Sequence, residues 1–540
     1  MKRILSFLIA LTLLAGCACQ AASLNPGGTL PLVSEPAELT ILRVQNPTVV
    51  DYDTNHYTQW LDEQTGLDIK FNFLPSTEAG TKLALMVQSG EKLGDVLNID
   101  LSRADIMAYV DAGVFRPLND YLQNSSYFMK ECYWHDRIEE NLPFYTMEDG
   151  NIYAYPYTNY AVSNEYSWRA YINKTWLDKL GLEAPKTTDD LVNVLTHFRD
   201  DDPNGNGQKD EIPMTGAGVA WRYFYPWVMS AFCYCDPTTN FLLVHDGQLS
   251  AAYVTDEWKA GIEFMKSLVD EGLVSPLAFT QDSSQLKSLL LSGDEQSVGF
   301  IVDTTLSSMN GDERIKDWDA QAPLQGPYGT AYTIHASSNL PDGGGRAFIL
   351  SECKDPDLAF ALLDYCASDE NTLSALCGVE GVDFELIADD DPNYKKLNPN
   401  AVYGVKFIND ITANSQNSFW GSGALLSNSA DTRVAVWSGD YSNWQDPSYQ
   451  NAMMWKCNEY NFAADEPDEL ALVLMYTDEE QEIVSTLAAD LETCVEENLT
   501  AFVTGYRSLD EWDEFVQEVH AIGLEDYLAI AQTAYDRLYK

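Results

Sequence analysis

The first hundred residues alternate between short apolar runs and segments of helical periodicity. Residues 39–45, 67–73 and 95–99 predict strands, and the second of these alternates strictly between apolar and polar side chains. Residues 57–63 and 77–89 lie between the strands and carry apolar side chains at helical spacing. The order strand, helix, strand predicts a mainly parallel sheet covered by helices.

Loops at one edge of such a sheet are the expected place for ligand binding. In open α/β sheets, ligands bind beyond the carboxyl ends of the strands. The candidate loops are therefore Asn46–His56, after the first strand, and Asn98–Asp100, after the third.

Helical periodicity dominates the later parts of the chain. Thr187 and Asp190 form a capping box, which begins a helix with apolar side chains on one face. Residues 255–271 predict another amphipathic helix, and 299–302 predict a strand that returns to a sheet. Residues 477–540 predict helices interrupted at two glycines.

Length and charge limit the kind of protein. A chain of 540 residues exceeds what one hydrophobic core usually organises, so two lobes are expected. The formal net charge of -51 disfavours binding to nucleic acid, because phosphates would be repelled. The same charge suits calcium or a neutral or cationic ligand.

The amino terminus predicts export and lipid anchoring. Two basic residues precede the apolar run Ile4–Leu14, which is too short to span a bilayer, so residues 1–16 predict a signal peptide. The sequence Leu14-Ala15-Gly16-Cys17 resembles a bacterial lipobox, in which Cys17 receives a diacylglycerol and becomes the first mature residue. The alternative is an ordinary signal peptide that happens to contain a cysteine. Residues 17–38 then predict a tether, and the protein would be held at the membrane by lipid without spanning it.

An Asp- and Asn-rich segment predicts a structural calcium ion. Short oxygen-bearing side chains stand at alternate positions, Gly207 follows at the sharp turn, and a backbone carbonyl is expected near position seven. The candidate ligands are Asp202, Asn204, Asn206, the Gln208 carbonyl, Asp210 and Glu211. Pro213 occupies the position where an EF-hand has its bidentate Glu, so Glu211 is the expected substitute in a shortened loop. The alternative is an ordinary surface turn, which the same residues also favour.

Cysteine usage does not predict a disulfide framework or a zinc site. Ten cysteines are present, and with Cys17 lipidated the other nine cannot all pair. Their spacing is irregular and the six histidines are dispersed. We expect most of these cysteines to be small buried hydrophobic residues.

Several segments together resemble a known family. They are Leu14–Cys17, 111–118, 172–182, 202–207, 270–273, 378–384, 508–513 and 534–537. In this order and spacing they are similar to the bacterial extracellular solute-binding proteins of ABC importers, in the carbohydrate-binding lipoprotein group that includes alginate-binding proteins. The resemblance also implies that the calcium loop uses the ligand set given above.

The resemblance implies a fold and a division of the chain. The expected fold is α/β and periplasmic-binding-protein-like (type II), with two α/β lobes joined by hinge strands that close over a ligand. The first lobe is expected at 39–157 plus about 298–345, and the second at 158–297 plus about 346–540.

The resemblance also implies a function. The protein would be a monomer and not an enzyme. It would lie on the outer face of a bacterial, Gram-positive cell membrane, capture a carbohydrate and deliver it to the permease subunits of an ABC importer.

Sugar binding needs flat aromatic faces for pyranose rings and planar polar side chains for hydroxyl groups. The chain has 13 Trp and 30 Tyr. The aromatic candidates are Trp221, Tyr223, Trp437, Tyr155 and Trp420, and the candidate hydroxyl partners are Asn98, Asp100, Arg169 and Asp303. Any one aromatic residue is more often a core residue than a ligand platform.

Two other functions fit the same composition. A lipid-anchored glycoside hydrolase would use two of the many carboxylates as acid and nucleophile, about 5 to 9 Å apart in a cleft. A peptide-binding protein on the same fold would need charged residues in place of aromatic ones in its cleft.

Overall fold

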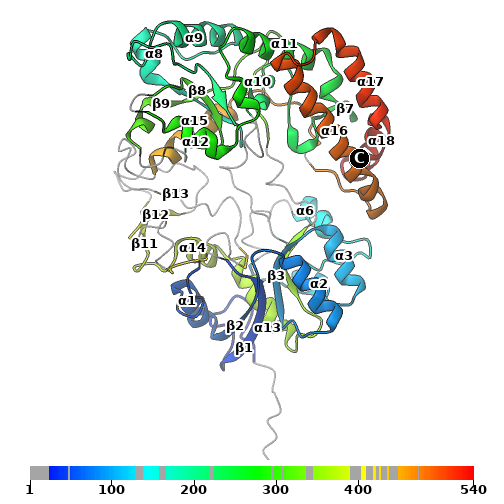
Figure 1. Ribbon diagram of the computed structural model, residues 1–540. Coiled ribbons are helices and arrows are strands. Elements are labelled where there is room, and N and C mark those ends of the chain that lie inside the picture. Colours follow the sequence, from blue (N-terminus) through cyan, green and yellow to red (C-terminus); the bar gives the residue numbers. More distant parts are fainter. Residues whose placement is uncertain are drawn as a thin grey trace, which may run out of the picture.

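The computed structural model describes residues 23–46, 49–127, 138–156, 166–217, 224–293, 296–306, 309, 312–335, 344–388, 403–408, 417–420, 425–426, 435–436, 448–471 and 473–540. These residues form two α/β lobes, which Figure 1 shows one above the other. The lower lobe in that view contains the first strands of the chain, and the upper lobe contains its last helices. We refer to them as the first and the second lobe.

The first lobe is built on a four-stranded sheet. Its strands are β1 (Ala37–Val44), β2 (Leu67–Leu74), β3 (Val96–Leu101) and β10 (Gly345–Ile349). Their order across the sheet is β2-β1-β3-β10, where the first three strands are parallel and β10 is antiparallel to β3. The parallel part confirms the prediction made from the alternation of strands and helices.

Helices cover both faces of this sheet. They are α1 (His56–Thr65), α2 (Ala79–Ser89), α3 (Arg103–Asp111), α4 (Asn119–Leu122), α6 (Ile138–Tyr145), α13 (Pro356–Cys366) and α14 (Asp369–Cys377). Ile41 of β1 belongs to a core that contains buried residues of α1 and α13, whereas its neighbour Leu42 belongs to a core with α2 and α3. Successive side chains of a strand point to opposite faces, so β1 contributes to both cores.

A small sheet adjoins the first lobe. It consists of β11 (Phe384–Ile387), β12 (Gly404–Phe407) and β13 (Ala435–Val436). Phe384 and Val405 pack with Leu373 and Cys377 of α14, and these contacts attach the small sheet to the first lobe.

The second lobe has its own four-stranded sheet. Its strands are β4 (Arg169–Asn173), β5 (Thr215–Gly216), β8 (Phe300–Asp303) and β9 (Trp318–Gln321), in the order β5-β8-β4-β9. A hairpin of β6 (Leu242–His245) and β7 (Gln248–Ala251) lies apart from this sheet. All residues of β4 are buried, and both neighbours, β8 and β9, run antiparallel to it.

Helices from two distant parts of the chain surround this second sheet. They are α8 (Lys174–Leu180), α9 (Thr188–Asp200), α10 (Tyr225–Met229), α11 (Asp256–Asp270), α12 (Ser283–Leu290), α15 (Ser448–Phe462), α16 (Asp478–Thr504), α17 (Trp512–Ile522) and α18 (Leu524–Tyr539). Residues of α9, α11, α16 and α17 share one large hydrophobic core. The predicted helices are confirmed here, including the capping box of Thr187 and Asp190 and the breaks at Gly505 and Gly523.

The predicted division of the chain into lobes is wrong for two segments in its second half. Residues 298–345 were expected in the first lobe, but β8 and β9 pair with β4 in the second. Residues after 346 were expected in the second lobe, but α13 and α14 pack in the first. A short apolar strand carries no local sign of which sheet it joins, because strand pairing is a contact between distant residues.

Taken through its described segments, the chain therefore changes lobe three times. The passages lie between residues 156 and 166, between 335 and 344, and between 436 and 448. Each lobe is consequently made of segments that are separated in the sequence.

Seven cysteines lie in the described residues. They are Cys233, Cys235, Cys353, Cys366, Cys377, Cys457 and Cys494, all with free thiols, and all but Cys494 are buried. Burial raises the pKa of the Cys366 and Cys377 thiols, so they stay protonated. This confirms the expectation of small buried hydrophobic residues for this part of the chain.

In the part of the chain that the structure describes, we find no helix with the length and apolar character that crossing a membrane requires. The predicted signal peptide and Cys17 lie outside the described residues.

Candidate functional site

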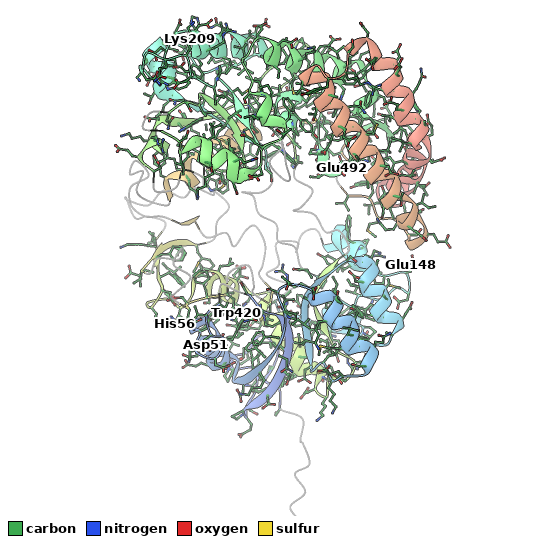
Figure 2. All side chains as sticks on the ribbon, viewed as in Figure 1. Asp51, His56, Glu148, Lys209, Trp420 and Glu492 are labelled. Carbon is green, nitrogen blue, oxygen red and sulfur yellow. The ribbon has the colours of Figure 1, made fainter. Side chains whose placement is uncertain are left out.

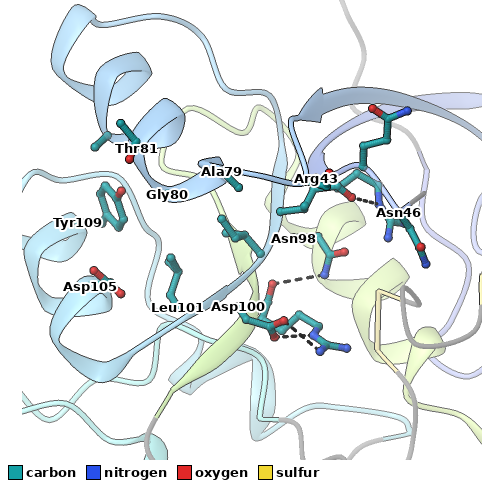
Figure 3. Close-up of a pocket in the computed structure, with 16 residues that line it drawn as sticks. Arg43, Asn46, Ala79, Gly80, Thr81, Asn98, Asp100, Leu101, Asp105 and Tyr109 are labelled. Carbon is teal, nitrogen blue, oxygen red and sulfur yellow. Dashed lines mark hydrogen bonds and ion pairs between the residues drawn. The ribbon is translucent and has the colours of Figure 1, made fainter. Parts of the chain in front are cut away.

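A pocket of about 760 Å³ lies at the carboxyl ends of β1 and β3 in the first lobe (Figure 3). The residues that follow β1 form one side of it, and the amino-terminal parts of α2 and α3 form another. Arg346 of β10 completes the lining. The pocket includes Asn46 and Asn98–Asp100, so it occupies the sheet edge at which the sequence predicted ligand contacts.

The pocket belongs to the side of the first lobe nearer the second lobe. Asn46 donates from Nδ2 to the Trp420 carbonyl at 3.2 Å. Figure 2 labels Trp420 in the part of the first lobe that is turned toward the second. The segment around Trp420 thus lies against this edge of the sheet.

An ion pair spans two strands in the pocket. Arg346 donates from Nε to Asp100 Oδ1 at 2.7 Å and from Nη2 to Asp100 Oδ2 at 3.1 Å. The Asp100 side chain is 76% exposed and that of Arg346 is 20% exposed. The bidentate geometry fixes the plane of the carboxylate, and the exposure of Asp100 leaves that carboxylate accessible to a ligand.

Asn98 is held in place by two carbonyl groups. Its Nδ2 donates to the Leu425 carbonyl at 3.2 Å and to the Arg346 carbonyl at 3.3 Å. The side chain is buried, and Asn98 pairs in register with Arg43 on the neighbouring strand. Asn98 therefore connects β3, β10 and the segment around residue 425.

Arg43 places a buried positive charge in the wall of the pocket. Its guanidinium lies 4.5 Å from the ring centroid of Trp420 and 4.9 Å from that of Tyr52. Burial lowers the pKa of Arg43 to about 10, so the group remains charged at neutral pH. Cation–π attraction to the two rings partly replaces the water that this guanidinium has lost.

Trp420 is a supporting residue in this structure. It is 1% exposed, and its Nε1 donates to Thr58 Oγ1 at 2.9 Å. Its ring packs against Tyr52, Tyr57 and Phe71. Its contribution to the pocket is to hold Arg43 and, through its carbonyl, Asn46.

Three other predicted ligand contacts lie away from the pocket. Tyr155 is fully buried, and its hydroxyl donates to Asp364 at 2.8 Å. Arg169 and Asp303 are buried cross-strand partners on β4 and β8 in the second lobe. Arg169 donates to Asn458 Oδ1 at 2.8 Å, which ties β4 to α15. These positions are those of core residues, and only Asn98 and Asp100 of the predicted polar contacts line the pocket.

The remaining predicted ligand contacts, Trp221, Tyr223 and Trp437, lie outside the described residues. Their role as ligand contacts remains a prediction.

Both cations of the pocket lining were missed from the sequence. Arg43 follows Leu39 and Ile41 at alternate positions of one strand, and all three are buried. A charged residue in a series of inward-facing apolar residues was the available signal. Arg346 offered no local signal, because its role depends on the pairing of β10 with β3.

The Asp- and Asn-rich loop follows α9 in the second lobe. Figure 2 labels Lys209, within this loop, on the side of the second lobe that faces away from the first. The two Asp202 oxygens accept from the Gly205 and Gly207 amides, each at 3.0 Å. Such bonds shape the loop without any ion, as the surface-turn alternative requires.

Further hydrogen bonds within the loop involve its two Asn side chains. Asn204 Oδ1 accepts from the Asn206 amide at 3.0 Å, and Asn206 Oδ1 accepts from the Gln208 amide at 2.7 Å. Asn206 Nδ2 donates to Asp210 at 3.0 Å. The Asn oxygens thus face the backbone in this structure.

Glu211 does not fit a simple turn. Both of its carboxylate oxygens are buried, and neither has a hydrogen-bond partner. Burial is the main cause that raises its pKa, and the charges of Asp210 and Asp202 raise it further. The amides of Asp210 and of Glu211 itself lower the pKa without reaching hydrogen-bond geometry. A buried carboxylate among like charges is costly unless a cation joins it, so the donor set of the loop fits a hard cation.

The loop is not gathered around a metal position in this structure. Over the described ranges, no three His, Cys, Asp or Glu side chains are arranged closely enough to hold an ion. Binding would therefore require the Asn side chains to turn their oxygens inward.

The fold and the pocket define a two-lobed binding protein with its pocket at a strand edge. The comparisons agree with this class. Residues 49–373 match the family model for bacterial extracellular solute-binding proteins. The chain therefore belongs to this family, as the resemblance implied, and it is a binding protein and not an enzyme.

Two curated relatives match much of the chain. One is the fructooligosaccharide ABC transporter substrate-binding protein FusA of Streptococcus pneumoniae, 26% identical over 98% of this chain and 96% of the relative. Another is the lipoprotein LipO of Bacillus subtilis, 26% identical over 71% of this chain and 74% of the relative.

Solved structures confirm the predicted fold class. A solute-binding protein of Bifidobacterium longum infantis, described as binding human milk oligosaccharides (HMO), has a TM-score of 0.73 at 20% identity, over 94% of this chain and 99% of that one. FusA in complex with kestose has a TM-score of 0.67 at 24% identity, over 93% and 99%. The alginate-binding protein AlgQ2, solved without calcium ion, has a TM-score of 0.57 at 20% identity, over 95% and 100%.

Proposed function

We propose that this protein captures an oligosaccharide and delivers it to an ABC importer. The observation that carries the proposal is the pocket of the first lobe. Asp100, Asn98 and Arg346 line this pocket, at the edge of the sheet where proteins of this fold class bind ligands. The relative FusA is a fructooligosaccharide-binding protein. The match to FusA extends over nearly the whole of both chains.

The pocket has the chemistry that sugar hydroxyls need. Asp100 offers two acceptor oxygens whose plane is fixed by Arg346, and charge-assisted bonds of this kind are among the stronger ones in proteins. Tyr109 of α3 adds an aromatic side chain to the lining. The second lobe would close over the sugar and exclude water, with the predicted aromatic residues Trp221, Tyr223 and Trp437 as candidate contacts.

A structural calcium ion in the loop after α9 is part of the proposal. The buried and unpartnered Glu211 carboxylate supports it. One of the solved structures of FusA is described as that of an EF-hand mutant, so an EF-hand is named in this relative. That structure has a TM-score of 0.66 and is 24% identical to this chain. The ion would be bound by Asp202, Asn204, Asn206, the Gln208 carbonyl, Asp210 and Glu211. Because the loop faces away from the first lobe, the ion would stabilise the second lobe without touching the sugar.

The proposed location is the outer face of the cell membrane. A signal peptide over residues 1–16 and a diacylglycerol on Cys17 would anchor the chain, and the similarity to a lipoprotein supports this arrangement. The protein would act as a monomer beside the permease subunits of its importer. Labelling of cells with a fatty-acid analogue would test the anchor, since the Cys17→Ala variant should lose the label.

Calorimetric titration of the purified protein with a panel of oligosaccharides tests the binding function. We expect one class of oligosaccharide to bind, without cleavage, and to raise the melting temperature. Asp100→Ala and Arg346→Gln should each weaken binding at least about tenfold, because each removes a charge-assisted contact or the support of one.

Asp68→Ala is the matched control for the pocket variants. Asp68 lies on β2 of the same sheet, and its carboxylate also pairs with a cation, Lys70, at 2.6 Å. It lies outside the pocket lining, so its loss should leave the affinity unchanged. Binding of peptides with no response to any sugar would overturn the carbohydrate function.

A further inference from the structure

The charged side chains that line the pocket indicate whether its ligand is neutral or acidic. This inference rests on the proposed sugar-binding function and concerns the same site. The fold itself does not decide the question, since FusA is a fructooligosaccharide-binding protein and AlgQ2 is an alginate-binding protein. The first sugar class is neutral, and alginate is a polymer of uronic acids.

Four charged residues line the pocket among those that the structure describes. They are Arg43, Asp100, Asp105 and Arg346, so their formal charges cancel. The selectivity then depends on which of these charges a ligand meets first, and exposure and pairing decide that.

Both cations are engaged by other groups. Arg346 uses Nε and Nη2 for Asp100. Arg43 is 2% exposed and lies against the rings of Trp420 and Tyr52. A ligand carboxylate would have to compete with Asp100 for the guanidinium of Arg346, and burial keeps the guanidinium of Arg43 from the ligand.

Both anions are exposed, but they have different partners. Asp105 caps the start of α3, where Oδ2 accepts from the Ser102 hydroxyl at 2.7 Å and from the Ser102 amide at 3.3 Å. Asp100 is 76% exposed, while its partner Arg346 is 20% exposed. An entering ligand therefore meets exposed carboxylates before it meets a cation, and Asp100 is the one that is paired with a cation of the pocket.

We propose that the Asp100–Arg346 pair makes this site selective for uncharged oligosaccharides and against sugars that carry carboxylates. A neutral sugar can donate two hydroxyl protons to the oriented carboxylate. A uronate at the same position meets a like charge whose counter-ion is already bound on the other side. The formal charge of -51 adds a repulsive field at longer range.

The test compares neutral and acidic oligosaccharides of matched length by calorimetric titration of the whole purified protein. The probes are kestose and nystose, galacto-oligosaccharides and oligogalacturonates. Wild-type protein should bind its best neutral sugar at least about tenfold more tightly than any uronate. Raising the salt concentration should narrow this ratio, because screening weakens the repulsion and leaves the fit of the sugar unchanged.

Asp100→Asn should change the selectivity in a defined direction. It removes the exposed charge, keeps the shape of the side chain and leaves Arg346 able to pair with a ligand. Neutral sugars should bind more weakly, while uronates should bind at least as well as before. The ratio of the affinity for the best neutral sugar to that for the best uronate should therefore fall by about fivefold or more. Asp68→Asn, on β2 outside the pocket, should leave the ratio unchanged.

Two results would overturn the selectivity while leaving sugar binding intact. One is a uronate that binds wild-type protein as tightly as any neutral sugar. The other is an Asp100→Asn variant, shown to be folded by its melting curve, whose ratio equals that of the wild type. If no sugar of either class binds, the proposed function fails and the selectivity fails with it.

Discussion

Asp364 in the first lobe and Glu211 in the second are both buried carboxylates, and their surroundings are opposite. Asp364 accepts from the hydroxyls of Ser125 and Tyr155 and from the amides of Ser126 and Tyr127. Glu211 accepts no hydrogen bond at either oxygen.

The difference separates two uses of a buried charge. Donors from two separate parts of the chain, residues 125–127 and Tyr155, meet at Asp364, so this carboxylate stabilises the folded first lobe without any ligand. At the proposed calcium site, Glu211 destabilises the folded second lobe until the cation joins it. Asp364 has its partners in the protein alone, whereas the proposed ion would supply the partner of Glu211.

The largest expected effect on stability comes from removing the Asp364 carboxylate. Asp364→Ala leaves four donors without an acceptor and should reduce the free energy of unfolding by on the order of 5 kcal/mol. Urea unfolding followed by tryptophan fluorescence measures this change. Asp357→Ala, which removes an exposed carboxylate on the same helix, should change it by less than about 0.5 kcal/mol. An equal effect of the two variants would contradict the assigned role.

Calcium should have the next largest effect, and it should depend on Glu211. At a thousandfold excess over its dissociation constant, the ion should stabilise wild-type protein by about 4 kcal/mol. Glu211→Gln should lose most of this gain, because a neutral amide neither neutralises nor chelates the ion. Glu183→Gln is the control, as Glu183 is an exposed residue before α9 and outside the loop. Melting curves with calcium and with chelator provide the measurement, and an equal gain in all three proteins would rule out this site.

Asp236 lies between these extremes and should give a pH-dependent effect. It is fully buried with three hydrogen bonds, from Thr238 and Tyr234, and burial raises its pKa to about 6. The folded state therefore holds the proton more tightly than the unfolded state. The stability due to this group is present below about pH 4 and is lost as the pH rises through 6, by about 3 kcal/mol.

The comparison with Asp236→Asn isolates this group from the many other carboxylates. The Asn side chain of the variant cannot titrate. The free energy of unfolding of the wild type minus that of the variant should therefore fall by about 3 kcal/mol between pH 4 and pH 7, measured in the presence of chelator. A difference that stays constant over this range would show that the pKa of Asp236 is not raised.

The smallest effect has the opposite sign. In chelator, Glu211→Gln should be more stable than wild type by about 1 kcal/mol, because it removes a buried charge that has no partner. Urea unfolding at pH 7 measures the difference. A less stable variant would mean that the Glu211 carboxylate already has a favourable partner without calcium.

The sequence predicted the elements of the fold better than their assembly. The three parallel strands, the capping box at Thr187 and the helices that end at Gly505 and Gly523 depend on local patterns, and all are confirmed. The lobe assignment of Phe300–Asp303 depends on a pairing with a strand more than a hundred residues away, and it was wrong. Local periodicity contains no information about that partner.

The candidate site shows the same limit. Asn98 and Asp100 were expected just after a strand and lie instead within the last residues of β3, but the rule for strand ends still located them at the pocket. Tyr155 and Trp420 were candidates because of their residue type, which does not distinguish a ligand platform from a core residue. Arg346 reaches Asp100 only after the chain has passed through the second lobe and returned.

The three passages between the lobes have a consequence for the synthesis and export of the chain. The first sheet lacks its fourth strand until residue 349 has been made, and the core of the second lobe lacks α16 to α18 until the last sixty residues or so have been made. Neither lobe can close as an independent folding unit on the ribosome, since its long-range contacts do not yet exist. In the proposed export, this late completion of both lobes would leave less folded structure to be undone before translocation.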